Sequence, residues 1–347
     1  RTHHRGTFPA PGWLPEYDWT GVVNPMDIPH GLAGPEGFFA HANNLLVEPS
    51  RNPVYFNTDS APSYRVERIL ERIAAEKQHT MDTSASIQVD LELKRARRVL
   101  PFMLEDLGAR DDWNGAESAA LALLKGWDCV AQADSAATAI FFATYREAAT
   151  AALRDEVDAN GFEFILAQRY SSNAYDLWFE NVQQPVWDDL STGGVTETRT
   201  GAVQAAFKRA VAWMISRQGP SPSAWRWGEM HDIQFTHVFG KQKLLAGFFN
   251  LPRAELGGGC DSVWKTHFDL GDPEAPFKVT AGPVFRMVLD LADIEHGRWV
   301  LDTGNSGWPG SPHYGDQFPL WRDGQYLPMC SNWGEIEKDV SAVLTLQ

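Results

Sequence analysis

The strongest constraint on the fold of this chain is the way its hydrophobic periodicity changes along the sequence. From about residue 63 to residue 216, apolar side chains recur at the spacing of amphipathic helices. They fall first at the i, i+3, i+4 and i+7 positions Val66, Ile69, Leu70 and Ile73. Further helices are predicted at 83–107, 116–125, 136–155, 174–180 and 196–216, with Pro101 a break or kink in the first of these.

The two ends of the chain have a different character. Residues 1–62 are rich in Pro, Gly, Asn and Trp, and we expect loops around one buried strand at 37–42. Near the other end, Phe285, Met287 and Leu289 alternate with Arg286, Val288 and Asp290, which predicts a strand with one apolar face.

A hairpin is predicted there, with strands near 284–291 and 298–303 and its turn at His296-Gly297. Strands at both ends with helices between them favour an α+β fold, in which the first and last segments share a sheet. We expect residues 1–347 to form a single unit, with its helical middle at about 63–216.

The charge balance limits the partners of the chain. Thirty Lys and Arg residues against 45 Asp and Glu residues give a net charge of −15. Such a surface repels phosphate backbones and anionic headgroups, so neither nucleic acid nor a membrane is an expected partner. Apolar runs such as 136–143 fall short of the ~20 residues that span a bilayer. The sequence has neither an initiator Met nor a secretory signal, and we expect a processed chain or a fragment.

Common catalytic and metal-binding patterns are absent from the sequence. Glu229, His231 and His237 do not form an HExxH motif, so no metal is expected, and the Gly-x-Ser-x-Gly nucleophile motif does not occur. Asp188 and Asp189 follow a Trp and suggest glycoside hydrolysis, but adjacent carboxylates usually point apart and fit a loop end better. The disulfide state of three scattered cysteines stays open; these are Cys129, Cys260 and Cys330.

Several short motifs occur in one order along the chain. They lie at 9–13, 18–21, 37–44, 64–69, 225–231, 285–291, 304–307 and 311–317. Together they resemble the penicillin acylase (penicillin amidase) family of N-terminal nucleophile hydrolases, over residues 1 to about 330.

The resemblance implies a four-layer αββα N-terminal nucleophile hydrolase fold, made from a precursor that cuts itself to expose a Ser at the start of its β-chain. This sequence resembles only the C-terminal portion of that β-chain. The expected partners are therefore the α-chain, the N-terminal part of the β-chain and a small-molecule N-acyl amide substrate. In the family the Ser hydroxyl attacks an amide carbonyl while the α-amino group acts as base, and water then hydrolyses the acyl-enzyme. We expect residues 1–347 alone to be inactive.

Two residues match functional positions of the family. Asn43, the first of an Asn pair, matches the side-chain donor to the oxyanion, since a neutral amide N–H can stabilise developing negative charge. Arg65 stands 22 positions further on and matches an arginine near the catalytic amine, which it would position and bias toward the neutral form. From the residues alone, Asn43 also fits a strand-end cap or a turn former, and Arg65 a solvated or ion-paired side chain.

The resemblance also bears on cofactors, metal binding, packing and localisation. No cofactor is expected. Some members bind a structural Ca²⁺ through carboxylates, but here residues 45–54 contain Glu48 as their only acid, which argues against that site. Trp225, Trp227 and His231 are predicted to pack with a buried polar partner, and His313 with Asp316 to fix a turn. Export to the periplasm or the extracellular space is implied by the resemblance.

The leading hypothesis is an amidohydrolase that cleaves a linear amide in an N-acyl compound. The acyl group and the amine stay open: a β-lactam antibiotic and an acyl-homoserine lactone both fit. The alternative is a non-catalytic carbohydrate- or protein-binding module that uses exposed Trp residues, and a glycoside hydrolase built on Asp188 and Asp189 is the third hypothesis.

Overall fold

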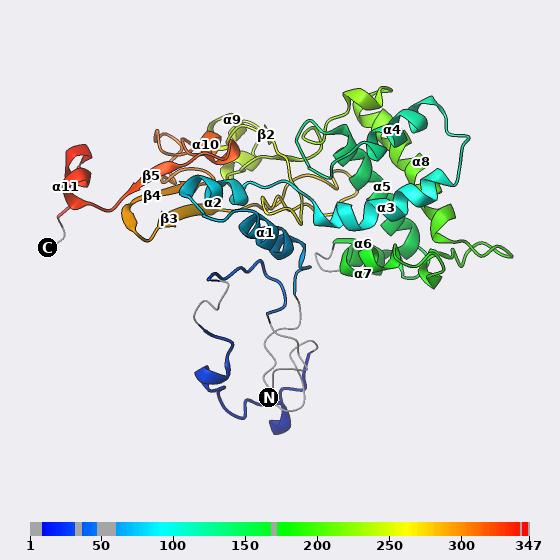
Figure 1. Ribbon diagram of the computed structural model, residues 1–347, viewed down its shortest axis with the longest axis horizontal. Helices are drawn as coiled ribbons and strands as arrows, with labels where there is room; N and C mark the ends of the chain where they lie inside the picture. Colours follow the sequence, from blue (N-terminus) through cyan, green and yellow to red (C-terminus); the bar gives the residue numbers. More distant parts are fainter. Residues whose placement is uncertain (1–8, 32–36, 47–59, 168–171, 341, 346–347) are drawn as a thin grey trace.

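The computed structural model describes residues 9–31, 37–46, 60–167, 172–340 and 342–345. One half contains most of the helices and the other contains the strands, with α1 (Tyr64–Ala74) alongside the junction (Figure 1). The helical half is formed by α3 (Lys94–Gly108), α4 (Gly115–Lys125), α5 (Ala136–Leu153), α6 (Ala159–Ala167), α7 (Ser172–Trp178) and α8 (Arg199–Gln218). Among the described helices, none is long and apolar enough to cross a bilayer.

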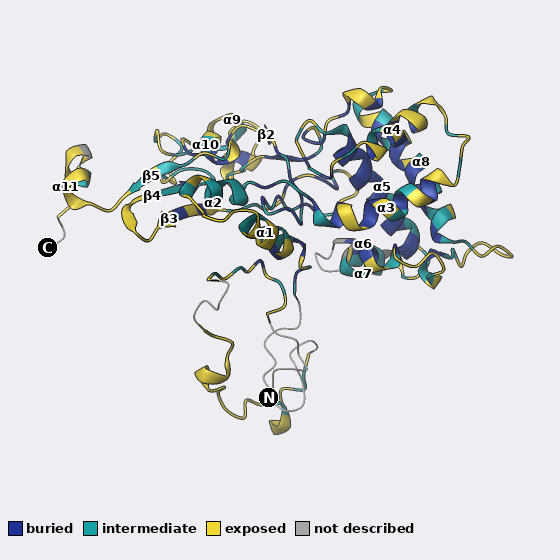
Figure 2. Ribbon diagram, viewed as in Figure 1, coloured by how far each residue is buried: buried dark blue, intermediate teal, exposed yellow. Residues whose placement is uncertain are grey.

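Helix α5 is the centre of the helical half. It starts at Ser135, whose hydroxyl accepts a hydrogen bond from the Thr138 N–H and caps the helix. Nearly all of its residues between Ala137 and Leu153 are buried, as expected of a helix that is apolar on every side. Its neighbour α8 buries one side against it, and Figure 2 shows the buried residues of the molecule concentrated around this pair.

The sequence prediction of the helices is largely confirmed. Helices α1, α4, α5, α7 and α8 match the expected ranges. The prediction of one helix over 83–107 is wrong, because α2 (Met81–Gln88) and α3 are separated by a segment in which Glu92 pairs with Val130. Pro101 does not end α3: it lies on the exposed side, where water can solvate the Arg97 carbonyl to which proline has no N–H to donate.

Two antiparallel sheets make up the other half. One pairs β1 (Asp232–Ile233) with β2 (Ala254–Glu255), and the larger one has the order β3 (Phe285–Asp290), β4 (Asp293–Leu301), β5 (Leu327–Cys330). The predicted hairpin is confirmed, but its turn is at Leu291-Ala292, and His296-Gly297 lies inside β4. The Asp290 Oδ1 atom accepts a hydrogen bond of 2.9 Å from the Ala292 N–H and closes the turn there.

The predicted strand with one apolar face is confirmed as β3, and this face points away from the core. Phe285, Met287 and Leu289 are 48%, 40% and 36% exposed, while Arg286 and Val288 are buried. The Arg286 guanidinium is held between two aromatic rings, 4.5 Å from the Trp264 ring centroid and 5.0 Å from that of Tyr326. The strand therefore buries its cationic side and leaves its apolar side open.

The first segment of the chain also differs from the prediction. Residues 37–46 contain no strand, and Phe39 is 69% exposed, so the buried strand expected at 37–42 is wrong. All strands of the described residues lie beyond residue 231, so the first and last segments share no sheet there. The core forms two clusters, one within the helical half and one beneath the sheets; the single unit over residues 1–347 stays a prediction.

The remaining elements are short. They are α9 (Ala246–Phe249), α10 (Phe318–Arg322) and α11 (Trp333–Ile336), with 3₁₀ turns at Pro15–Tyr17, Pro25–Asp27, Pro185–Trp187, Pro222–Ala224, Phe239–Lys241 and Glu337–Asp339.

Candidate functional site

The loop at Asn43 is held in a specific conformation. Asn43 has φ of 63°, in the left-handed region that Asn adopts more readily than most residues. Its carbonyl accepts a hydrogen bond of 2.8 Å from the Ala61 N–H, and Asn44 Oδ1 accepts one of 3.0 Å from the Ala42 N–H. The first bond ties the loop to the segment that leads into α1, and the second lies within the loop itself.

Arg65, the second residue of α1, reaches back to this loop. Its Nη2 atom donates to the Ala42 carbonyl at 2.6 Å and to Asn43 Oδ1 at 2.9 Å. A guanidinium can only donate, so the amide oxygen of Asn43 must face it and the Nδ2 group must point elsewhere. Within the described part of the chain no atom accepts a hydrogen bond from Nδ2, and Asn43 is exposed. The pair therefore presents an oriented amide donor at the surface.

Both residues predicted from the sequence thus lie together. The contact shows that the Arg65 guanidinium is hydrogen-bonded and not simply solvated, while its role in the reaction stays a prediction. The turn-former alternative for Asn43 is correct for its backbone, which does adopt a turn conformation. It does not account for the orientation of its side chain.

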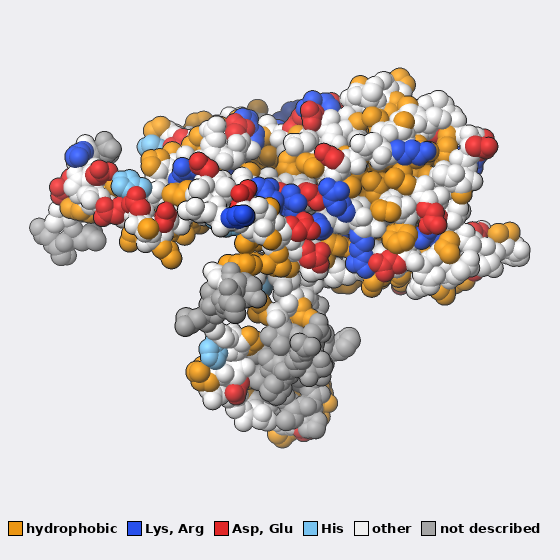
Figure 3. All heavy atoms as spheres, in the orientation of Figure 1, with side chains coloured by type: hydrophobic (Ala, Val, Ile, Leu, Met, Phe, Trp, Pro, Cys, Tyr) orange, Lys and Arg blue, Asp and Glu red, His pale blue; other side chains and the backbone are white. Residues whose placement is uncertain are grey.

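Ion pairs hold the next turns of α1 in place. Arg68 donates to both carboxylate oxygens of Asp90, at 3.0 and 2.8 Å, and Arg72 donates to Oδ2 of the same carboxylate at 2.5 Å. Burial raises the pKa of Asp90, but hydrogen bonds from Arg68, the Glu92 N–H and Arg72 outweigh it, so the net pKa lies below its ordinary value. Figure 3 shows acidic and basic side chains side by side over this face.

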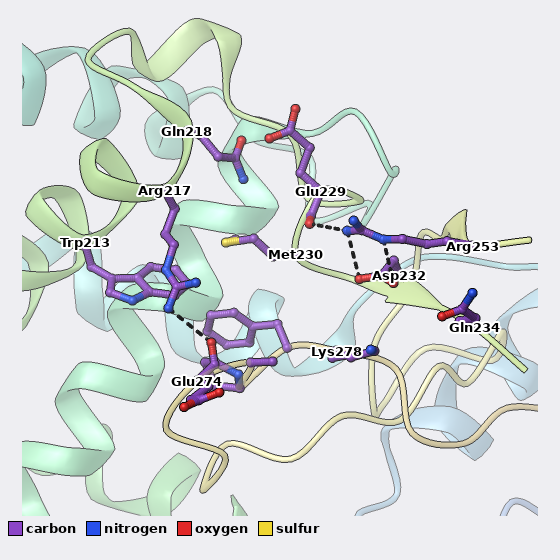
Figure 4. Close-up of a pocket in the computed structure, with 13 residues that line it drawn as sticks. Trp213, Arg217, Gln218, Glu229, Met230, Asp232, Gln234, Arg253, Glu274 and Lys278 are labelled. Carbon is purple, nitrogen blue, oxygen red and sulfur yellow. Dashed lines mark hydrogen bonds and ion pairs between the residues drawn. The ribbon is translucent and has the colours of Figure 1, made fainter. Parts of the chain in front are cut away.

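A cleft of about 400 Å³ lies elsewhere, between the end of α8 and the loop at 274–278 (Figure 4). Three of the charged side chains that line it contact other lining residues: Arg253 Nε lies 2.7 Å from Asp232 Oδ2, and Arg217 Nη2 donates to the Glu274 carbonyl at 3.1 Å. The described residues that line it include neither member of the Asn43–Arg65 pair and no Ser, Thr, Cys or His. The cleft supplies no nucleophile or base of that kind.

The prediction for His231 is confirmed. This imidazole is fully buried, with Nδ1 2.8 Å from the Phe277 carbonyl and Nε2 2.7 Å from Thr266 Oγ1. It stacks on Trp227 with ring centroids 4.5 Å apart. Burial lowers the pKa of His231 to about 3, so the ring is neutral and has a structural role.

Other candidate groups are also engaged in local structure. His313 Nδ1 lies 2.8 Å from Asp316 Oδ2 and fixes the predicted turn. Asp188 and Asp189 accept backbone hydrogen bonds from Glu197 and Ser191, at 2.9 and 3.0 Å, as at a loop end. The cysteines are all free; they are Cys129, Cys260 and Cys330.

The expected absence of a metal site stays a prediction. Glu48 lies outside the described residues. Among the residues that the structure describes, no group of three His, Cys, Asp or Glu side chains could hold a metal ion.

Comparison with known proteins identifies the family. The family model for penicillin amidase matches residues 1–338. The chain belongs to that family. It is 30% identical over 338 residues to a penicillin acylase 2 proenzyme of Pseudomonas sp. (strain SE83), over 97% of this chain and 42% of that protein. It is 26% identical over 344 residues to the acyl-homoserine lactone acylase QuiP of Pseudomonas syringae pv. tomato, over 94% of this chain and 41% of that protein.

This member of the penicillin amidase family therefore spans about two fifths of the length of these relatives. A thermostable penicillin G acylase from Alcaligenes faecalis superposes with a TM-score of 0.57 at 16% identity, over 95% of this chain and 60% of that one. The α+β chain carries part of the N-terminal nucleophile hydrolase fold, to which its described residues contribute a three-stranded and a two-stranded sheet.

Proposed function

We propose that this chain is part of an amidohydrolase that cleaves the linear amide of an N-acyl compound. Family membership supports this reaction class, and the relatives are named as acylases of penicillin and of acyl-homoserine lactones. We take both classes as candidate substrates, because each contains an acyl group joined to an amine by an exposed amide.

The proposed nucleophile is an N-terminal Ser on polypeptide outside residues 1–347. Its Oγ attacks the amide carbonyl carbon while the α-amino group of the same Ser takes the hydroxyl proton. The C–N bond then breaks, the leaving amine receives that proton, and an acyl-enzyme ester remains. Water hydrolyses this ester and releases the carboxylic acid.

In this mechanism the Asn43 side chain donates to the carbonyl oxygen as it becomes an oxyanion. The observation that carries the proposal is the hydrogen bond of 2.9 Å between Arg65 Nη2 and Asn43 Oδ1. That bond turns the Nδ2 group outward before substrate arrives, and a donor fixed in advance stabilises developing charge without reorganisation. The guanidinium also polarises the amide and strengthens Nδ2 as a donor.

The proposed partner of this chain is the remainder of the enzyme. The chain spans about two fifths of its relatives, and apolar side chains on β3 and on α1 are exposed. On β3 the exposed side chains are Phe285, Met287 and Leu289, and on α1 the exposed side chain is Leu70, at 39%. Figure 3 shows hydrophobic side chains beneath α1 and along the hairpin.

The test is amine release by the complete enzyme from a panel of penicillins and N-acyl-homoserine lactones, with variants at Asn43. We expect Asn43→Ala to lower kcat about 10²–10³-fold, the range for loss of an oxyanion donor. Asn43→Asp keeps the shape and attracts Arg65, yet removes the donor, so we expect a loss at least as large. Asn24→Ala is the matched control, because Asn24 is an exposed Asn that caps a 3₁₀ turn. Full activity of Asn43→Asp would overturn the role of Asn43, and absence of amine release from the whole panel would overturn the function.

A further inference from the structure

Apolar burial alone does not fix the position of α1. Of its eleven residues only Tyr64 and Val66 are buried, and Leu70 is 39% exposed. The helix nevertheless has to place the Arg65 guanidinium within hydrogen-bonding distance of Asn43. Polar contacts must therefore account for much of its register, and the contact nearest to Arg65 in the sequence is that of Tyr64.

Tyr64 enters a buried polar cluster formed by four helices. Its hydroxyl donates to Asp176 Oδ2 on α7 at 3.0 Å, and Arg95 Nε on α3 donates to the same oxygen at 3.0 Å. Tyr145 on α5 donates its hydroxyl to Asp176 Oδ1 at 2.8 Å. Asp176 is 1% exposed, Arg95 4% and Tyr64 6%, so solvent cannot replace these bonds.

Further contacts restrain the cluster. Arg95 also pairs with Asp261 at 2.5 Å, and its guanidinium lies 5.6 Å from the Tyr64 ring centroid. Arg98 Nη1 donates to the Tyr64 hydroxyl at 3.2 Å from the solvent side. The first residue of α1 is thus fixed from inside the molecule, one position before Arg65.

We infer that Tyr64 and Asp176 are positioning residues for the reaction: their hydrogen bond places the start of α1, so that Arg65 orients the Asn43 amide toward the oxyanion. This inference rests on the proposed function, because it assigns Tyr64 no effect except through Asn43. The juxtaposition that carries it is a buried contact at Tyr64 immediately followed by a surface contact at Arg65.

The structure offers a matched pair of variants. Tyr64 and Tyr145 each donate one phenol hydroxyl to the same carboxylate, one to each oxygen. Tyr64→Phe and Tyr145→Phe therefore remove the same kind of bond from Asp176. Only the first loosens the helix that carries Arg65, since Tyr145 belongs to α5.

The experiment measures kcat, KM and the melting temperature of both variants in the complete enzyme. We expect Tyr64→Phe to lower kcat about 3–10-fold with KM unchanged, the effect of losing about one hydrogen bond in the transition state only. We expect Tyr145→Phe to keep kcat within about twofold, because Arg95 still holds the Asp176 oxygen that binds Tyr64 and Tyr145 does not belong to α1. Arg98→Met, which removes the outer donor to the Tyr64 hydroxyl without entering the core, should shift kcat in the same direction by a smaller factor. It provides the test if Tyr64→Phe does not fold.

A double-mutant cycle with Asn43→Ala separates positioning from stability. If Tyr64 acts through Asn43, Tyr64→Phe should lower kcat no further in the Asn43→Ala background. Equal kcat losses in Tyr64→Phe and Tyr145→Phe, or an undiminished Tyr64→Phe effect without Asn43, would overturn the inference alone. Unchanged kcat in Asn43→Ala would overturn both the role of Asn43 and the inference.

Discussion

Replacing Arg65 by Lys tests whether the guanidinium controls the Asn43 amide. Arg65 Nη2 donates hydrogen bonds to two acceptors, the Ala42 carbonyl at 2.6 Å and Asn43 Oδ1 at 2.9 Å. Lysine keeps the positive charge but lacks the planar fork, and its shorter side chain cannot reproduce both contacts. The Asn43 amide then loses the contact that holds its oxygen inward.

The expected magnitude follows from the type of bond that is lost. A hydrogen bond to a charged group contributes about 1.5–3 kcal/mol, and the exposure of Asn43 favours the lower end of that range. A loss of about 1.5 kcal/mol in the transition state lowers kcat roughly tenfold. Arg65→Met loses both contacts and the charge, and we expect a decrease of up to about 100-fold.

Steady-state kinetics of the complete enzyme provide the assay. KM should stay within about twofold, since Arg65 contacts Asn43 and no substrate contact is assigned to it. Arg68→Lys is the control: it makes the same substitution one turn further along α1, where the partner is Asp90. Unchanged kcat in both Arg65 variants, together with a large loss in Asn43→Ala, would refute the idea that Arg65 orients the amide.

Three further predictions concern the stability and assembly of the chain. Asp106→Asn should destabilise the fold by about 3 kcal/mol in chemical denaturation, because the buried Arg199, 2.7 Å from Asp106 Oδ2, would keep only the exposed Glu105 as its carboxylate partner; a loss below about 1 kcal/mol would contradict this. Burial holds the His231 pKa at about 3, so between about pH 6.5 and 3 only the unfolded chain takes up this proton. As the pH is lowered through that window, the free energy of unfolding should decrease by up to about 1.4 kcal/mol per pH unit. His231→Gln should reduce this dependence on pH, and an identical dependence in wild type and variant would exclude the effect. Residues 1–347 expressed alone should be oligomeric or poorly soluble, because the apolar face of β3 is exposed. The double substitution Met287→Thr and Leu289→Thr should reduce this association in sedimentation experiments. A monomer of the unsubstituted chain that melts cooperatively would count against the proposed partner surface.

The helical middle of the chain could be predicted because local sequence determines it. Periodicity located α1, and family motifs identified Asn43 and Arg65, which the structure brings together. Periodicity could not determine which face of β3 is buried. The alternation defines two faces, and the choice between them depends on Trp264 and Tyr326, which hold Arg286 from other parts of the chain.

The cluster beneath α1 could not be predicted for a related reason. Tyr64 and Asp176 are 112 positions apart, and neither belongs to a recognisable spacing pattern. Similarly, a single side-chain hydrogen bond, from the Ala292 N–H to Asp290, lies at the observed hairpin turn. Gly297, on which the predicted turn was based, lies within β4. Long-range partners and single local bonds of this kind leave no periodic signal.

The most direct test of the proposed chemistry is to locate the acyl group during turnover. The complete enzyme would be quenched in acid while it cleaves a slowly hydrolysed N-acyl substrate, then digested and analysed by mass spectrometry. We expect the mass of one acyl group on an N-terminal Ser of a peptide outside residues 1–347, with less adduct in Asn43→Ala at the same time point. An acyl group on a side chain within residues 1–347, or on a Ser that has no free α-amino group, would contradict the mechanism.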